Sequence, residues 1–228
     1  MIIFLRTQAQ FWSTSQTFPI LSWNEQSEIS FDLINDTSFQ KFLDETHPFQ
    51  NPNYEPSDLA PIPSDFTSNS AKKFQLRAKA GTQFADMAWH FWDHFKKKKR
   101  LTITSAYRSY AHQQQLQKNF CRKNQCAEPW SSEHQAGLAI DIGQNGKRFD
   151  KASLEWMQEN AHKRGFHQTY QKWPEIDWKM IEPRHWRYVG KELATELYEK
   201  QLSFRQWFYE QENKKLIQFS WDILGTGN

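Results

Sequence analysis

The residues with the clearest chemical potential lie in two short segments, residues 132–141 and 182–188. The first, Ser-Glu-His-Gln-Ala-Gly-Leu-Ala-Ile-Asp, carries an imidazole at His134 and a carboxylate at Asp141. Asp141 lies in an apolar run, where a lone carboxylate is costly to bury unless it is paired or bound to a cation. The second segment offers His185 as a third ligand. Two histidines and one carboxylate, with a fourth position open to water, form a common catalytic zinc arrangement.

Glu182 lies close enough to His185 in the sequence to stand beside a metal-bound water without ligating the metal. Bound zinc lowers the pKa of water from about 15.7 towards roughly 7. Glu182 would take the proton as general base and return it to the leaving amine. The chain has no His-Glu-x-x-His motif, so the spacing differs from that of the peptidases that carry it.

The remaining histidines keep the ordinary interpretation of surface or core residues. They are His47, His90, His94, His112, His162 and His167. His90 and His94 are spaced i, i+4 and could bind a metal in principle, but they lie in an aromatic helical stretch without a third ligand.

The elements that must position these side chains alternate between helices and short strands. Apolar spacing predicts helices over residues 71–95, 110–123, 153–164 and 193–208, with Gly81 weakening the first and Gly165 ending the third. Short β-branched or apolar runs predict strands at 101–106, 138–142 and 186–189. This order predicts an α+β domain with a small sheet.

The first part of the chain differs in composition. Residues 16–23 and 28–34 are typical of short strands or irregular structure, and residues 48–63 contain five prolines. We therefore divide the chain into an N-terminal extension with a Pro-rich strap (1–70), a catalytic domain (71–192) and a C-terminal helical tail (193–228). A strap packed on the catalytic domain is favoured over a separate binding domain.

Composition and charge exclude several classes of protein. The 228 residues are 38% hydrophobic, and 29 basic against 26 acidic residues give a net charge of +3, too balanced to indicate a nucleic-acid partner. The basic run at 96–100 is expected to be a solvated helix end. The longest apolar run, Met1–Leu5, is too short to span a membrane and does not resemble a secretory signal.

The chain has two cysteines, Cys121 and Cys126. They suit a small disulfide loop in an oxidising compartment, and a reduced pair is equally compatible with their number and spacing.

Four segments together resemble the VanY-type D-alanyl-D-alanine carboxypeptidases, zinc peptidases with the LAS-type fold. The segments are residues 105–113, 132–141, 156–166 and 182–190, in the order and spacing of that family. The resemblance implies an α+β fold, with a small antiparallel sheet flanked by helices and a zinc site in a surface cleft. It covers about residues 75–190 and leaves both ends of the chain unexplained.

The resemblance also implies roles for individual residues. Zinc (Zn2+) would be held by His134, Asp141 and His185, with Glu182 as catalytic base. Arg108 would bind a peptide carboxylate, for which its forked guanidinium is suited. Gln113 and Ser132 would line the substrate cleft.

The chain departs from the family pattern at two places. Arg184 stands where the family usually has Trp, and Glu128-Pro-Trp-Ser131 replaces a Pro-Gly turn. Neither change touches a ligand or the base, so both bear on substrate preference rather than on activity.

The leading hypothesis is a zinc-dependent D,D-carboxypeptidase that removes the terminal D-Ala from peptidoglycan stem peptides or muropeptides. Alternatives with the same metal site are an L,D-carboxypeptidase and a peptidoglycan endopeptidase. A non-catalytic wall-binding or zinc-sensing module is less favoured, because all three ligands and the base are present. We expect a monomer in the periplasm or cell envelope, with the cytoplasm as the alternative because no signal peptide is visible.

Overall fold

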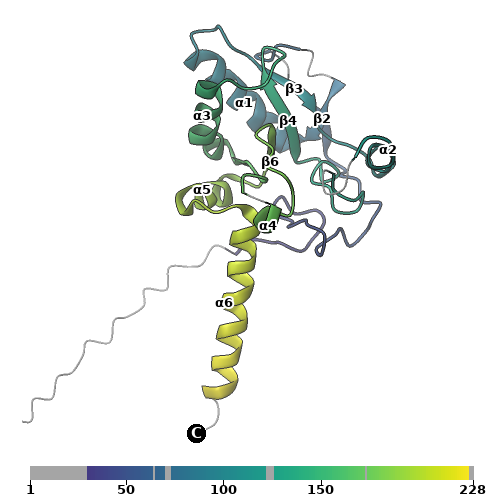
Figure 1. Ribbon diagram of the computed structural model, residues 1–228, viewed down its shortest axis with the longest axis vertical. Helices are drawn as coiled ribbons and strands as arrows, with labels where there is room; N and C mark the ends of the chain where they lie inside the picture. The colour runs from purple at the N-terminus through teal and green to yellow at the C-terminus, as the bar shows by residue number, and fades with distance from the viewer. Residues whose placement is uncertain (1–29, 64, 70–72, 122–125, 173, 226–228) are drawn as a thin grey trace, which may run out of the picture. The chain divides into compact units, whose positions relative to one another are not determined.

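The computed structural model describes residues 30–63, 65–69, 73–121, 126–172 and 174–225 (Figure 1). The chain divides into two units, Met1–Ser30 and Phe31–Asn228, and the description below concerns the second. The short strand or irregular structure predicted at residues 16–23 lies outside the described residues.

The described chain alternates between helices and short strands. The strands are β1 (Leu59–Pro61), β2 (Gln75–Arg77), β3 (Leu101–Ser105), β4 (Ala139–Gln144), β5 (Phe166–His167) and β6 (His185–Tyr188). The helices are α1 (Ala78–His94), α2 (Tyr110–Phe120), α3 (Lys151–Asn160) with the 3₁₀ turn η2 (Ala161–Arg164), α4 (Pro174–Asp177), α5 (Lys191–Lys200) and α6 (Phe204–Gly225).

The central sheet has four strands in the order β3-β4-β6-β5, and every neighbouring pair is antiparallel. Its register places Asp141 of β4 opposite Ser105 on one side and opposite His185 on the other. A pair of opposed residues in an antiparallel ladder has Cα atoms only about 4.5–5.5 Å apart. The sheet therefore brings two of the predicted metal ligands together.

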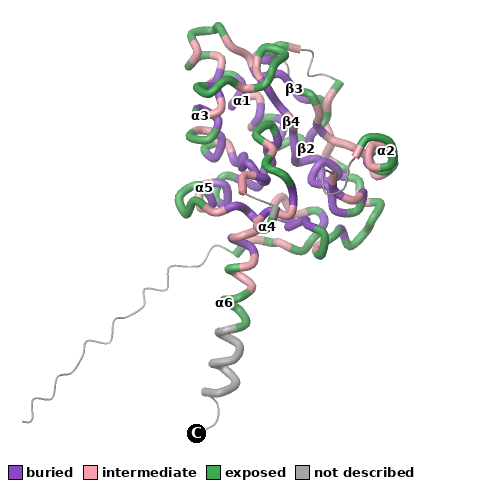
Figure 2. The backbone as a smooth tube through the Cα atoms, in the orientation of Figure 1, coloured by how far each residue is buried: buried purple, intermediate pink, exposed green. Residues whose placement is uncertain are grey.

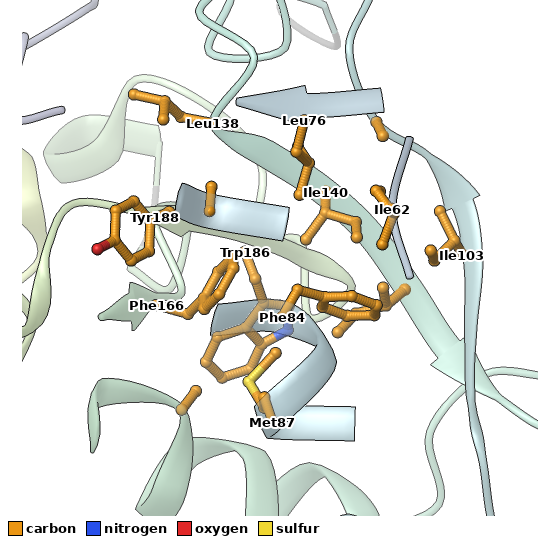
Figure 3. Packing of buried hydrophobic residues seen from close by; sticks show 14 of the residues in the cluster. Ile62, Leu76, Phe84, Met87, Ile103, Leu138, Ile140, Phe166, Trp186 and Tyr188 are labelled. Atoms are coloured by element: carbon orange, nitrogen blue, oxygen red, sulfur yellow. The ribbon is translucent and has the colours of Figure 1, made fainter. Parts of the chain in front are cut away.

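The main hydrophobic core lies between α1 and one face of this sheet (Figure 3). From α1, the buried side chains recur at helical spacing, with Phe84, Met87 and Phe91 fully buried. From the sheet, Ile140 and Trp186 face the same cluster. The α+β class with a small antiparallel sheet flanked by helices is confirmed.

The described part of the N-terminal extension packs on these elements. Leu43, Phe49 and Ile62 belong to the main core, whereas Phe42 joins a second apolar cluster with α5 and α6. The first turns of α6 contain the buried residues Phe204, Trp207 and Phe208, and Figure 2 shows buried backbone at this end of the helix. The division at residues 70 and 192 stays a prediction.

Several predicted boundaries differ from the structure. Residues 75–77 form β2 rather than helix, because they pair with β1, and α1 runs through Gly81 without a break. The helix predicted over 193–208 is two helices, since Gln201 takes a left-handed conformation (φ 55°) that ends α5. The tail continues as helix to Gly225. Residues 30–34 are irregular, which is one of the two alternatives predicted for residues 28–34. No helix among the described residues is both long and apolar enough to cross a membrane.

Candidate metal-binding active site

His134, Asp141 and His185 converge at one end of the central sheet. Each offers a ligand atom, and these three atoms lie within 4.8 Å of one another. His134 Nε2 is 3.4 Å and His185 Nδ1 is 3.2 Å from the same Asp141 oxygen, Oδ1. The ladder supplies Asp141 and His185, and the turn before β4 supplies His134.

The turn that carries His134 depends on a glycine. Gly137 has φ +65°, a left-handed conformation that favours glycine. A Cβ atom there would lie 2.9 Å from a methyl group of Leu59. The amide of Gly137 donates to the His134 carbonyl at 3.2 Å, which closes the turn. This conformation returns the chain from His134 into β4 and hence to Asp141.

Both imidazole rings are oriented by acceptors on their far side. His134 Nδ1 lies 2.7 Å from the carbonyl oxygen of Ala106, and His185 Nε2 lies 2.8 Å from Glu133 Oε2. Each ring can donate its remote N–H to that acceptor and keep the lone pair of its other nitrogen directed towards Asp141. Metal-ligating histidines nearly always have such an arrangement, so the donor set fits zinc.

The electrostatics of the site favour a positive charge at its centre. Burial lowers the pKa of His185, but its hydrogen bonds to Asp141 and Glu133 outweigh burial and raise the pKa to about 10. The pKa of Asp141 lies well below its usual value, because neighbouring His134 and His185 outweigh its burial. A metal cation supplies the positive charge that this arrangement stabilises.

Glu133 and Arg187 form a buried pair behind His185. Glu133 Oε1 accepts a hydrogen bond from Arg187 Nη1 at 2.8 Å, and Oε2 accepts one from the Thr169 hydroxyl at 2.9 Å. Burial raises the pKa of Glu133, but the charge of Arg187 and the His185 hydrogen bond prevail and lower it to about 2. Arg187 also donates to the carbonyl oxygen of Lys41 in the extension. Glu133 is thus held ionised against the ring of His185.

Glu182 stands at the turn that leads into β6. Its amide donates to the Tyr170 carbonyl at 2.9 Å, and its own carbonyl accepts from the amide of His185 at 3.1 Å. Burial raises the pKa of Glu182, against the positive charges of His185 and Lys179. Glu182 and Asp141 both line a cleft of about 570 Å³, within the usual size range of ligand pockets.

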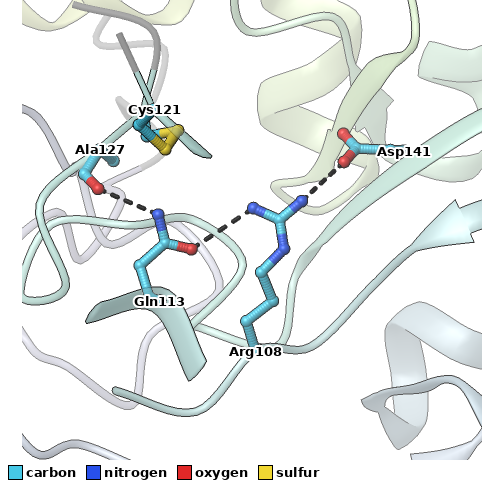
Figure 4. The surroundings of a disulfide bond; sticks show 6 residues. Arg108, Gln113, Cys121, Ala127 and Asp141 are labelled. Carbon is cyan, nitrogen blue, oxygen red and sulfur yellow. Dashed lines mark hydrogen bonds and ion pairs between the residues drawn. A yellow bond between two sulfur atoms is a disulfide. The ribbon is translucent and has the colours of Figure 1, made fainter. Parts of the chain in front are cut away.

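Arg108 and Gln113 reach the same site from the loop after β3 and from α2 (Figure 4). Arg108 Nη2 donates to Asp141 Oδ2 at 2.9 Å, and its Nη1 donates to Gln113 Oε1 at 3.4 Å. The Gln113 amide donates in turn to the Ala127 carbonyl at 3.0 Å, next to the Cys121–Cys126 disulfide. Ser132 is buried at the start of the His134 turn.

Sequence reasoning did not single out Glu133, Arg187 or Lys179 as parts of the site. Arg187 was visible as a charged residue between Trp186 and Tyr188, which signals a buried partner, whereas Glu133 lies in a polar stretch that gave no such signal. Lys179 stands between Trp178 and the apolar residues Met180 and Ile181, so it carried the same signal as Arg187. His90 and His94 belong to no three-ligand group in the described part of the chain.

The fold and this site define the class of protein, the LAS-type zinc peptidase fold, to which similar solved structures belong. Residues 73–191 match the family model of VanY, D-alanyl-D-alanine carboxypeptidase, and the chain belongs to that family.

Three known proteins illustrate the likeness. YodJ of Bacillus subtilis (strain 168), itself named only provisionally as a carboxypeptidase, is 35% identical over 173 residues, which are 68% of this chain and 62% of YodJ. The structure of the LdcB LD-carboxypeptidase is 32% identical and covers 76% of this chain and 87% of its own, with a TM-score of 0.64. A Zn(II) complex of a mutant of the vancomycin-resistance D,D-pentapeptidase VanY, 23% identical, covers 75% of this chain and 99% of its own, with a TM-score of 0.60. The chain thus spans less than two thirds of the length of YodJ.

Proposed function

We propose that this protein is a zinc-dependent D,D-carboxypeptidase that removes the terminal D-Ala from peptidoglycan stem peptides. The convergence of His134, Asp141 and His185 within 4.8 Å, beside Glu182, carries the proposal. Membership of the D-alanyl-D-alanine carboxypeptidase family supports the substrate. The zinc complex of the VanY structure supports the choice of metal.

His134 Nε2, Asp141 and His185 Nδ1 would hold the ion. When bound, zinc supplies Lewis acidity for the scissile carbonyl and a lowered pKa for water. Glu133 and the Ala106 carbonyl fix the tautomers of the two rings, so that the nitrogens facing Asp141 are free to ligate.

Glu182 is the general base of the proposed reaction. Its carboxylate lines the cleft with Asp141, and its raised pKa makes it a better proton acceptor than an ordinary glutamate. After it accepts a proton from the attacking water, the same carboxyl returns a proton to the leaving amine. A negative charge on Glu182 is tolerated because Lys179 and Arg108 lie near it.

Arg108 would bind the terminal carboxylate of the substrate. Its guanidinium is fixed on one side by Ser105 at 2.9 Å and on another by Gln113, so that little side-chain freedom remains to be lost on binding. Arg108 also donates a hydrogen bond to Asp141, so a carboxylate bound by Arg108 would bring the preceding peptide bond close to Asp141.

We place the reaction outside the cytoplasm, in the periplasm or cell envelope. Peptidoglycan is assembled there, and the Cys121–Cys126 disulfide is the kind of bond that persists in oxidising compartments.

The test is hydrolysis of a mixture of pentapeptide and tetrapeptide muropeptides, read by mass spectrometry. Zinc-loaded protein should remove one alanine from the pentapeptide alone, and chelator-treated protein and Glu182→Gln should not. Loss from the tetrapeptide would instead assign an L,D-carboxypeptidase with the same metal site. If zinc-loaded protein cleaves neither peptide, the carboxypeptidase proposal is wrong.

A further inference from the structure

The cleft beside Asp141 and Glu182 has a basic wall. Arg148 and Arg184 both line it, together with the catalytic carboxylates. Both arginines are exposed, and neither guanidinium makes a hydrogen bond or ion pair with another residue that the structure describes. Two unpaired guanidinium groups at the mouth of an active site form an anion-binding wall.

Both arginines are attached to the strands that carry the metal ligands. Arg184 immediately precedes His185, and its carbonyl accepts a hydrogen bond from the Ile142 amide at 2.9 Å. Arg148 follows the tight turn that ends β4, in which Gln144 and Lys147 pair. Their backbones are therefore fixed relative to Asp141 and His185, although their side chains reach into solvent.

The rest of the wall suits a peptide rather than a free ion. Met180 and Ile181 line the same cleft, with 52% and 40% of their surfaces exposed. Apolar side chains left open in a concave site are typical of places where a ligand covers them.

The residues proposed to hold the end of the substrate do not line this cleft. Arg108, Gln113 and Ser132 are not among its lining residues, whereas Asp141 and Glu182 are. A peptide whose C-terminal carboxylate lies at Arg108 would pass Glu182 at the scissile bond. Its upstream residues would then lie in the cleft, beside Arg148 and Arg184.

We propose that Arg148 and Arg184 bind a second carboxylate, one that the stem peptide carries upstream of the scissile bond. The enzyme then selects acidic stem peptides over their amidated forms. This inference rests on the proposed function and adds the substrate class. The carboxylate can come from the α-carboxyl group of a γ-linked D-glutamate or from the side chain of diaminopimelate, and both present the same chemistry to a guanidinium.

Cleavage of matched peptides tests the proposal. Three pentapeptide stems are compared: one with both carboxylates free, one amidated at D-glutamate, and one amidated at diaminopimelate. We expect kcat/KM to fall about fivefold for the amide that replaces the bound carboxylate, as for a partly exposed charge pair. Arg184→Gln and Arg148→Gln should remove that preference. Lys147→Gln, which removes a neighbouring exposed charge outside the cleft lining, should keep it.

Binding measured without turnover separates this inference from the proposed function. Calorimetry on zinc-loaded Glu182→Gln gives the dissociation constant of each peptide, and the free acid should bind about fivefold more tightly than one amide. Adding Arg184→Gln to that variant should equalise the constants. If all three peptides bind equally well, the inference is overturned. If binding shows the preference but the wild-type protein cleaves no peptide, the carboxypeptidase proposal fails and the inference survives.

Discussion

At the scale of single residues, the carboxylate of Glu133 is almost fully buried beside the candidate metal ligands. It is only 1% exposed, yet it is ionised, because Arg187 and His185 each contact one of its oxygens. A buried charge that keeps all its partners is tolerated, whereas removal of one partner leaves the others uncompensated. Glu133 is therefore a positioning residue for His185, not a residue that touches substrate.

Glu133→Gln should weaken zinc binding by about 10- to 100-fold, because the amide orients the His185 ring less strongly and no longer raises its basicity. Competition with a chromophoric chelator measures the affinity, and thermal unfolding of the metal-free proteins reports any loss of structure separately. Glu155→Gln, on the exposed face of α3, is the matched control. An unchanged zinc affinity in Glu133→Gln would remove Glu133 from the site.

The pH profile of the reaction should reflect the raised pKa of Glu182. Only the ionised carboxylate accepts a proton, so kcat/KM should fall as the pH drops through this pKa. Because burial raises the pKa of Glu182, the acidic limb should lie above the ordinary glutamate value of 4.5. Glu182→Gln should lower kcat by about 10²- to 10⁴-fold and abolish that limb. An acidic limb that persists unchanged in Glu182→Gln would belong to another group.

Lys179 is a buried amine whose charge opposes folding. It is 2% exposed, its Nζ has no hydrogen-bond partner among the described residues, and burial lowers its pKa from 10.5 to about 8. The penalty is complete below pH 8 and disappears as the pH rises through 10.5, since both states are then neutral.

Lys179→Met should therefore raise the free energy of unfolding at pH 7 by about 1–3 kcal/mol. The difference from wild type should shrink between pH 8 and 10.5. Urea titrations across this pH range measure both effects, with the exposed Lys151→Met as control. Destabilisation of Lys179→Met at pH 7 would mean that the ammonium has a stabilising partner.

At the scale of elements, the extension is joined to α6 by aromatic packing. Phe42 stacks on Phe208 with ring centroids 3.9 Å apart and meets Phe204 edge to face at 5.2 Å. Arg205 adds ion pairs with Asp44 and Glu45 at 2.8 and 2.7 Å. This contact stabilises both segments at once.

Phe42→Ala should lower the free energy of unfolding by about 3 kcal/mol, because a buried aromatic ring is replaced by a cavity. The corresponding fall in Tm is about 10 °C for a chain of this size. Phe120→Ala, at a position 78% exposed, should change Tm very little. Differential scanning calorimetry measures the Tm of both variants. Equal Tm values for Phe42→Ala and Phe120→Ala would show that the Phe42 contact is not formed.

The sequence predicts the elements that have a local signal. The apolar run at 138–142 and the spacing of Phe84, Met87 and Phe91 correspond to β4 and α1. The strands β1, β2 and β5 have only two or three residues each, so their existence depends on distant partners that no local pattern reveals. The break between α5 and α6 likewise occurs at Gln201, a residue type without a turn preference.

The candidate site was likewise predictable only where its residues carry a local signal in the sequence. The candidate ligands and Glu182 have characteristic types and spacing, and the structure brings them together. The Glu133–Arg187 pair joins residues 54 positions apart, and its formation depends on how the His134 turn packs behind β6. Spacing along the chain contains no information on such a contact. The assignment of roles to Arg108, Gln113 and Ser132 stays a prediction.

At the scale of the whole molecule, the disulfide bears both on the stability of the fold and on the compartment in which the protein works. The Cys121–Cys126 loop adjoins Ala127, whose carbonyl holds Gln113 (Figure 4). Protein isolated from its native source without reductant should contain no free thiol by thiol titration. Replacing both cysteines by serine should cost about 2 kcal/mol of stability, as expected for a short loop. Two reactive thiols in the folded native protein would argue for a reducing compartment and against our placement.

The bond between Arg187 and the carbonyl of Lys41 has a consequence for biosynthesis. The two residues are 146 positions apart, and ribosomes add about 5–20 residues per second. Arg187 is therefore synthesised roughly 7–30 s after Lys41. During that interval the nascent chain presents the Phe42 ring without the α6 residues that later cover it. Glu133 also lacks its guanidinium partner until β6 has been translated. The proposed metal site can therefore reach its final geometry only after most of the chain has been made, which favours metal loading after synthesis rather than during it.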